Sequence, residues 1–143
     1  MAKRLWLLFA QFVTLCLAII FVAAMQLNSN LAIERVLTGL FYAGIVNVIY
    51  FVFTLFGVEL IPWNNVYNRV LGTFGNPNFV GSFMGIFIVL CTVRLVDRST
   101  ILRWRVILVV LILVSIYEVK LSLAVQGIVI TCLGWAIIAF FYI

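Results

Sequence analysis

The polar segment at residues 69–81 reads RVLGTFGNPNFVG and separates two long apolar stretches of the chain. It gathers an arginine, two asparagines, a threonine and a proline. The whole sequence of 143 residues is 67% hydrophobic and 9% charged, with a mean hydropathy of +1.33. Soluble domains, which need a polar surface, do not have this composition. We therefore predict an all-α, polytopic helical membrane protein in which this segment breaks the series of membrane-spanning helices.

The apolar runs approach the roughly 20 residues that cross a bilayer as helix. The fourth run is the shortest, because Glu118 and Lys120 favour the headgroup region, although a lysine can snorkel and let a helix continue. Pro62 is expected to end the second run, and Pro77 suits the first turn of the third. We predict about five transmembrane helices, at residues 5–25, 36–61, 77–93, 106–117 and from 121 or 125 to 143.

Two regions follow from this pattern. Residues 1–35 are expected to form a signal-anchor-like span and a loop, because the first apolar run is too long for a typical cleaved signal peptide. Residues 36–143 are expected to form a transmembrane bundle.

Arginines indicate the orientation of that bundle. Residues 94–105 carry four arginines and one aspartate, and short cytoplasmic loops collect basic residues. The loop at 62–76 would then be extracytoplasmic. Lys3 and Arg4, however, favour a cytoplasmic N-terminus, and three spans between the two basic clusters make both signals incompatible. The orientation of the first span stays open.

Composition also excludes several kinds of chemistry. The chain has no histidine, so imidazole ligation of haem or copper and histidine-based acid–base catalysis are excluded. Cys16, Cys91 and Cys132 are far apart and lack the spacing of a metal or redox site. The net charge of +5 is spread over membrane-flanking loops, which favours contact with anionic headgroups rather than nucleic acid. We expect no metal, no cofactor and no nucleic-acid partner.

The polar segment is the candidate binding site. Its glycines permit positive φ or close approach of backbone, and Pro77 restricts Asn76 to extended conformations. A bent segment that enters a helix exposes backbone N–H groups, which together with an arginine can bind a phosphate or pyrophosphate. The alternatives are a turn that binds nothing, and asparagines that cap the third helix rather than bind sugar hydroxyls. The candidate ligand-binding residues are Arg69, Gly72, Thr73, Gly75, Asn76 and Asn78.

Polar residues within the other runs are interpreted structurally. Asn47 is expected to hold helices together rather than to bind substrate. Glu59, near the extracytoplasmic end of the second run, could pair with Arg69 or reach water. Glu118 and Lys120 are two residues apart and do not share a helical face.

Arg69 and the run GTFGNPN at 72–78 resemble the signature of the O-antigen ligase and O-antigen polymerase superfamily. The later run SLAVQG at 122–127 is similar to that family's Ser-x-Gln-Gly turn. The resemblance covers residues 36–143. It implies a membrane glycosyltransferase that moves a glycan from an undecaprenyl-diphosphate carrier, as in lipopolysaccharide assembly in the bacterial inner membrane. It also implies that Arg69 faces the carrier pyrophosphate on the periplasmic side.

The chain departs from that family in length and in its lack of histidine, which the family carries in a large periplasmic loop. We therefore expect a truncated relative that binds polyprenyl-diphosphate or lipid phosphate and is not catalytic alone. The alternative is a small structural or accessory subunit of a larger membrane complex, with other membrane protein subunits as partners. A transporter or channel subunit is a third hypothesis, disfavoured because no second helix interruption is paired with the first.

Overall fold

The computed structural model describes residues 30–61, 63 and 69–142. The chain divides into two compact units, Met1–Leu37 and Thr38–Ile143. In the first unit only residues 30–37 are described, and they are helical. The predicted span at 5–25 lies outside the described residues. The contacts between helices described below lie within the second unit.

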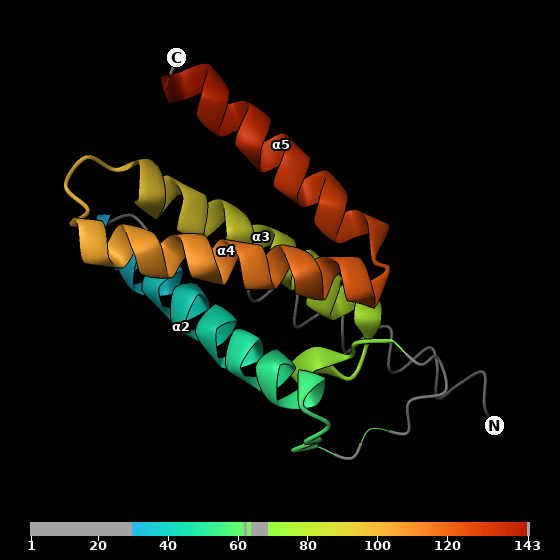
Figure 1. Cartoon of the computed structure of the whole chain (residues 1–143). Coiled ribbons are helices and arrows are strands. Elements are labelled where there is room, and N and C mark those ends of the chain that lie inside the picture. Colours follow the sequence, from blue (N-terminus) through green and yellow to red (C-terminus); the bar gives the residue numbers. More distant parts are fainter. Residues whose placement is uncertain (1–29, 62, 64–68, 143) are drawn as a thin grey trace. The chain divides into compact units, whose positions relative to one another are not determined.

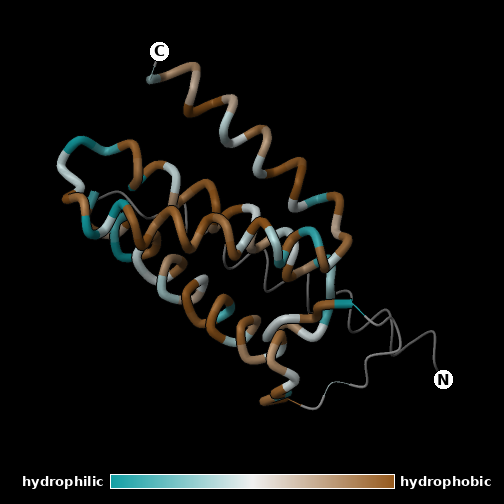
Figure 2. Tube along the Cα trace, in the orientation of Figure 1, coloured by the Kyte–Doolittle hydropathy of each residue, from teal (hydrophilic) through white to brown (hydrophobic). Residues whose placement is uncertain are grey.

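Every regular element in the described part of the chain is helical, which confirms the all-α class (Figure 1). By length and composition, three of these helices could cross a membrane, namely α2, α3 and α5. Helix α4 is 21 residues long but carries Arg103, Arg105, Glu118 and Lys120 towards its ends. Figure 2 shows long hydrophobic stretches along all four helices. The elements are α2 (Asn30–Leu55), the 3₁₀ helix η1 (Gly72–Phe74), α3 (Pro77–Val96), α4 (Leu102–Ser122) and α5 (Val125–Tyr142).

Helix α2 is shifted from its predicted position at 36–61. Residues 30–35, expected as loop, are helical, because exposed charged residues such as Glu34 and Arg35 are good helix formers that extend a helix beyond its apolar run. At the other end Leu55 is the last helical residue and Gly57 has a φ of 76°. A glycine in this left-handed conformation ends helices. The prediction that Pro62 ends the helix was therefore wrong.

Helix α3 begins where the sequence predicts. Asn76 is its N-cap, and the side-chain oxygen of Asn76 accepts a hydrogen bond from the backbone N–H of Asn78 at 2.9 Å. Pro77 occupies the first helical position, where a missing N–H has no cost. The capping interpretation of Asn76 is confirmed.

The charged loop is shorter than predicted, because α4 extends beyond 106–117 in both directions and leaves only residues 97–101 outside helices. The guanidinium of Arg105 donates to the carbonyl oxygen of Thr100 at 2.9 Å, and the Thr100 hydroxyl donates to that of Arg94 at 2.7 Å. The backbone N–H of Ser99, which donates to the Asp97 carboxylate at 2.9 Å, holds the pKa of Asp97 below its ordinary value. These bonds fix a tight turn between α3 and α4.

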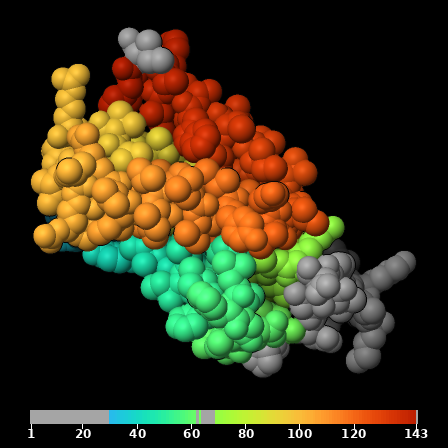
Figure 3. Space-filling model, in the orientation of Figure 1, coloured from blue at the N-terminus to red at the C-terminus, as the bar shows by residue number. Residues whose placement is uncertain are grey.

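Helix α3 is the centre of the second unit and packs against α4, α5 and η1. Its side chains Val80, Met84, Phe87 and Ile88 are almost fully buried. Phe41 of α2 packs against Phe87, with ring centroids 5.6 Å apart. In Figure 3 helix α4 (orange) separates the visible atoms of α2 from those of α5.

Helices α3 and α5 approach each other through glycines. A Cβ atom on Gly85 would lie 2.7 Å from the carbonyl oxygen of Gly127, closer than real Cβ contacts allow. A Cβ on Gly81 would similarly meet Ala124, in the short connection between α4 and α5. The start of α3, the end of α4 and the start of α5 therefore meet at one end of the bundle, opposite the turn at 97–101.

Candidate functional site

Asn47 joins α2 to the polar segment. Its side-chain oxygen accepts two hydrogen bonds from Thr73, one from the backbone N–H at 3.2 Å and one from the hydroxyl at 2.9 Å. Its amide nitrogen donates to the carbonyl oxygen of Ala43 at 3.3 Å within α2. Asn47 is 3% exposed, so these bonds satisfy a polar group that would be costly to bury alone. The residue does hold elements together as predicted, but its partner is η1 rather than another long helix.

Trp63 supports the same turn from the other side. Its indole Nε1–H donates to the carbonyl oxygen of Gly72 at 3.0 Å. Its ring lies against Gly75, where a Cβ atom would come within 2.6 Å of it. Gly72 and Gly75 have φ values of 54° and 65°, so the predicted need for positive φ is confirmed at both positions. Two tight contacts and two left-handed residues therefore define the shape of η1.

A polar pocket of about 360 Å³ opens beside this turn. It is the candidate functional site, and we call it the polar pocket. Helix α2 supplies one wall, Glu59, Trp63 and residues 69–72 supply the second, and Leu121 of α4 completes it. Its lining residues are Tyr50, Thr54, Leu55, Glu59, Trp63, Arg69, Val70, Leu71, Gly72 and Leu121.

The six predicted ligand-binding residues do not all reach the polar pocket. Arg69 and Gly72 line it. The other four have structural tasks or lie elsewhere: Thr73 bonds to Asn47, Gly75 packs on Trp63, Asn76 caps α3, and Asn78 is exposed at the start of α3.

Sequence reasoning missed the contribution of α2 to this site. The Tyr50 hydroxyl lies 3.4 Å from the carbonyl oxygen of Ile61, to which it donates, and the Thr54 hydroxyl donates to the carbonyl oxygen of Tyr50 at 3.0 Å. Asn47, Tyr50 and Thr54 are spaced by three and four residues, which places them on one face of a helix. That polar face in an apolar run was a usable signal.

Charge in the polar pocket comes from Glu59 and Arg69, one of each sign. The two sequence alternatives for Glu59, pairing with Arg69 or reaching water, both stay predictions. No cluster of three or more potential metal-ligating side chains occurs within the described residues. The guanidinium of Arg69 is the group that suits an anion, because the hydroxyls of Tyr50 and Thr54 and the indole N–H of Trp63 already donate to backbone carbonyl oxygens.

Glu118 has an unexpected environment. Its side chain is 0% exposed and lies on the packed face of α4, while its position relative to the headgroups stays a prediction. Among the described residues, neither carboxyl oxygen has a hydrogen-bond partner. The helical register explains the burial, since Ile112, Ser115, Val119 and Ser122 of the same face are buried as well.

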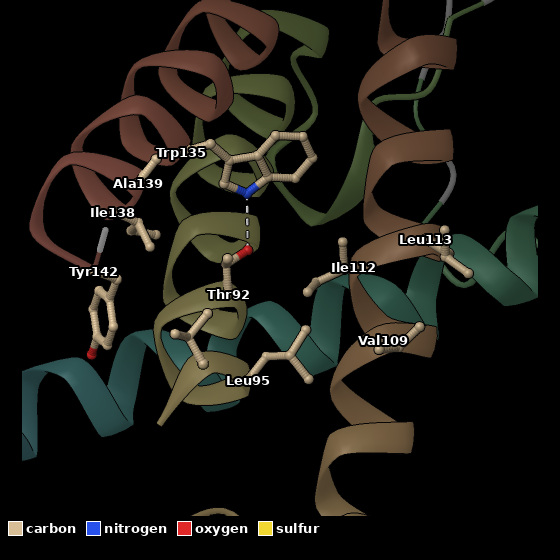
Figure 4. A pocket seen from close by; sticks show the side chains of 10 residues that line it. Thr92, Leu95, Val109, Ile112, Leu113, Trp135, Ile138, Ala139 and Tyr142 are labelled. Atoms are coloured by element: carbon tan, nitrogen blue, oxygen red, sulfur yellow. Dashed lines mark hydrogen bonds between the residues drawn. The ribbon is translucent and has the colours of Figure 1, made fainter. Parts of the chain in front are cut away.

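A second, apolar cavity of about 460 Å³ lies towards the opposite end of the bundle (Figure 4). Its lining comes from the C-terminal parts of α3 and α5 and the first half of α4. The Trp135 indole N–H donates there to the Thr92 hydroxyl at 2.9 Å, and this hydroxyl donates to the carbonyl oxygen of Ile88 at 2.8 Å. The other lining side chains are apolar except for Tyr142, which carries a phenolic hydroxyl. The cavity therefore has few polar groups that could anchor a ligand.

Comparison with models of known protein families, with curated proteins and with solved structures finds no match to this chain. The arguments about function therefore rest on the residues and geometry described above.

Proposed function

We propose that this chain is an integral membrane protein that binds the phosphate groups of a polyprenyl-linked or related lipid in the polar pocket. The observation that supports it best is that the guanidinium-bearing Arg69 lines the same pocket as Gly72 of the glycine-rich turn. A guanidinium binds phosphate oxygens with two parallel hydrogen bonds, and an isolated hydroxyl or amide cannot replace it.

The arrangement of the helices supports a lipid rather than a soluble anion. The polar pocket lies where α2 ends and α3 begins, next to helices long and apolar enough to cross a bilayer. A lipid bound there could place its phosphate near Arg69 while its chain follows the exposed apolar side chains of α2. Those include Val46, Ile49 and Phe53, which are 43–57% exposed.

The predicted orientation fits this proposal. The turn at 97–101 and its flanking helix ends, which together carry four arginines, lie at the end of the bundle opposite the polar pocket. If basic residues stay in the cytoplasm, the pocket faces the extracytoplasmic side, which in the bacterial inner membrane is the periplasm. The resemblance to O-antigen ligases places the carrier pyrophosphate on that side as well. The five-span topology, with a first span at 5–25, belongs to the same proposal.

Binding, rather than glycan transfer, is proposed because the chain has no histidine. Thr73 and Asn76, which the resemblance would assign to the ligand, are engaged in hydrogen bonds that shape the turn. We therefore propose lipid-phosphate binding, and no catalysis by this chain alone, for a protein that resembles the O-antigen ligases.

Native mass spectrometry of the full chain in detergent micelles tests the proposal. Polyprenyl diphosphate and polyprenyl phosphate should bind, and the uncharged polyprenol should bind at least tenfold more weakly. Replacing Arg69 with alanine removes a hydrogen bond to a charged group, which contributes about 1.5–3 kcal/mol. Affinity for the diphosphate should then fall by roughly 10- to 150-fold.

Arg98→Ala is the matched control, because Arg98 is exposed in the turn at the opposite end of the bundle. Its affinity should equal that of the unmodified chain. Equal binding of polyprenol and its diphosphate, or equal losses in the two arginine variants, would contradict a phosphate site at Arg69.

A second candidate function is that of an accessory subunit in a membrane complex. Helix α5 favours it, because only Gly127 and Thr131 of this helix are buried, and large side chains such as Phe140 and Phe141 are 77–81% exposed. Co-purification of a stoichiometric partner from native membranes would support this role. A stable single chain that binds lipid diphosphate would favour the first.

A further inference from the structure

We propose that Glu118 is a proton-binding site within the helix bundle, and that its proton exchanges with water from the side of the polar pocket. The proposal rests on the burial of this side chain and the absence of a described partner for it. It does not depend on phosphate binding.

The first step concerns the charge state that the packing allows. Both carboxyl oxygens of Glu118 are enclosed, and no described group donates to them. An ionised carboxylate in such surroundings is strongly disfavoured, whereas a carboxylic acid lacks the net charge that makes burial costly. The packed structure is therefore that of the neutral acid.

Nearby donors are already engaged. The Ser115 hydroxyl, one turn before Glu118, donates to the carbonyl oxygen of Leu111 at 2.7 Å. The Ser122 hydroxyl, one turn after it, donates to that of Val119 at 2.8 Å. These hydroxyls lie on the same helical face but form their bonds within α4. The two serine hydroxyls therefore do not donate hydrogen bonds to a Glu118 carboxylate.

The elements packed against this position contribute few charged groups. The buried residues of α3 along Pro77–Met84, where the end of α4 packs, carry no ionisable group: Pro77, Val80, Gly81 and Met84. The start of α5 contributes Gly127 and Thr131 to the packed face. The remaining described charged or titratable side chains at this end of the bundle are Tyr50 of α2, Glu59 and Arg69 of the polar pocket, and Tyr117 and Lys120 of α4.

A proton is the ligand that fits this site. It needs no space, whereas a metal cation or an organic cation would require several ligands and an opening that a side chain with 0% exposure does not have. On release, the proton passes from a Glu118 oxygen to water and leaves a carboxylate that must gain hydration. Water therefore enters the bundle when Glu118 ionises.

Leu121 marks the shortest described route for that water. It lines the polar pocket and lies three residues after Glu118, on the adjacent turn of α4. The apolar cavity, by contrast, contacts α4 at Val109, Ile112 and Leu113, which are more than one turn before Glu118. A proton that moves between Glu118 and water in the polar pocket therefore passes along about one turn of α4.

Infrared spectroscopy of the full chain in lipid nanodiscs tests the site. The chain has three glutamates, so labelling glutamate carboxyl carbons with ¹³C gives a spectrum that variants can assign. At neutral pH we expect a protonated-carboxyl band that disappears in Glu118→Gln and persists in Glu34→Gln, whose side chain is exposed. The absence of the band at neutral pH, or its persistence in Glu118→Gln, would overturn the proposal.

Glu118→Asp provides a second variant if the glutamine variant does not fold. It should remove the band from the glutamate-labelled spectrum and restore it when aspartate is labelled instead. The route is tested by the rate at which the band shifts in D₂O. Leu121→Trp should slow exchange at least threefold, and Leu113→Trp, in the apolar cavity, should leave it unchanged. Equal rates in both variants would contradict exchange from the polar pocket.

Discussion

The side-chain oxygen of Asn47 accepts both the backbone N–H and the hydroxyl of Thr73, at 3.2 and 2.9 Å. This pair connects the middle of α2 to η1 across 26 residues of chain. The side-chain amide of Asn47 therefore helps to fix, together with Trp63, the turn that lines the polar pocket.

Asn47→Ala leaves a part-buried backbone N–H of Thr73 without its acceptor. An unsatisfied group of this kind costs about 1–3 kcal/mol, so the free energy of unfolding should fall by that amount. Thr73→Val removes only the hydroxyl bond and should cost less. Thermal unfolding of both variants and of the double variant should show a coupling of about 0.5–3 kcal/mol. Strict additivity of the two effects would contradict the pairing.

Trp63→Phe removes the indole N–H that donates to Gly72 and keeps an aromatic ring beside Gly75. The expected loss of stability is about 0.5–1.5 kcal/mol, the net contribution of one hydrogen bond. Trp63→Ala removes the ring as well and should cost more. Thermal unfolding distinguishes the two losses. If Phe and Ala were equally tolerated, Trp63 would have no part in holding the turn.

Gly85→Ala introduces a methyl group that would lie 2.7 Å from the carbonyl oxygen of Gly127. Backbone cannot yield as a flexible side chain does, so α3 and α5 must move apart at a cost of about 1–3 kcal/mol. Gly39→Ala is the control, since nothing lies within 4 Å of its added methyl group. It should gain about 0.5–1 kcal/mol through helix propensity. Spin labels on α3 and α5 would report the separation, and an unchanged distance with unchanged stability would exclude the close approach.

Asp97 should make the turn at 97–101 sensitive to acid. The backbone N–H of Ser99 lowers the pKa of this carboxyl from its ordinary value of 3.8, so the folded state favours the ionised form. The resulting stabilisation is fully present above that value and is lost as pH falls through the lower, folded pKa. The melting temperatures of the unmodified chain and Asp97→Asn should therefore differ at neutral pH and converge in strong acid. A difference that persists in strong acid would argue against this bond as its source.

Much of the fold followed from local rules. Pro77 and Asn76 fixed the start of α3, and the apolar runs located α2 to α5. The ends of helices were less predictable, because hydropathy shows which residues are apolar and not where the backbone hydrogen bonds of a helix end. Glu34 and Arg35 continue α2 outside its apolar run, and Gly57 ends it before Pro62.

The polar pocket was only partly predictable. Arg69 and Gly72 stand out in the sequence because they interrupt an apolar stretch. Tyr50 and Thr54 do not, because they join the same pocket only when α2 packs beside a segment that is distant in the chain. Thr73 was predicted to bind a ligand, but its hydroxyl donates to the side chain of Asn47. No local sequence rule predicts a hydrogen bond between residues so far apart in the chain. Glu118 illustrates the same limit, since the register of α4 against α3 decides its burial.

The pairing of Asn47 with Thr73 also imposes an order on biosynthesis. Asn47 leaves the ribosome 26 residues before Thr73, so α2 can enter the bilayer while its amide oxygen still lacks both donors. If α2 spans the membrane, it enters the bilayer with this polar side chain still unsatisfied. Assembly of the pocket is then a late event, because Thr73 lies in η1 and Leu121, which completes the pocket, lies in α4.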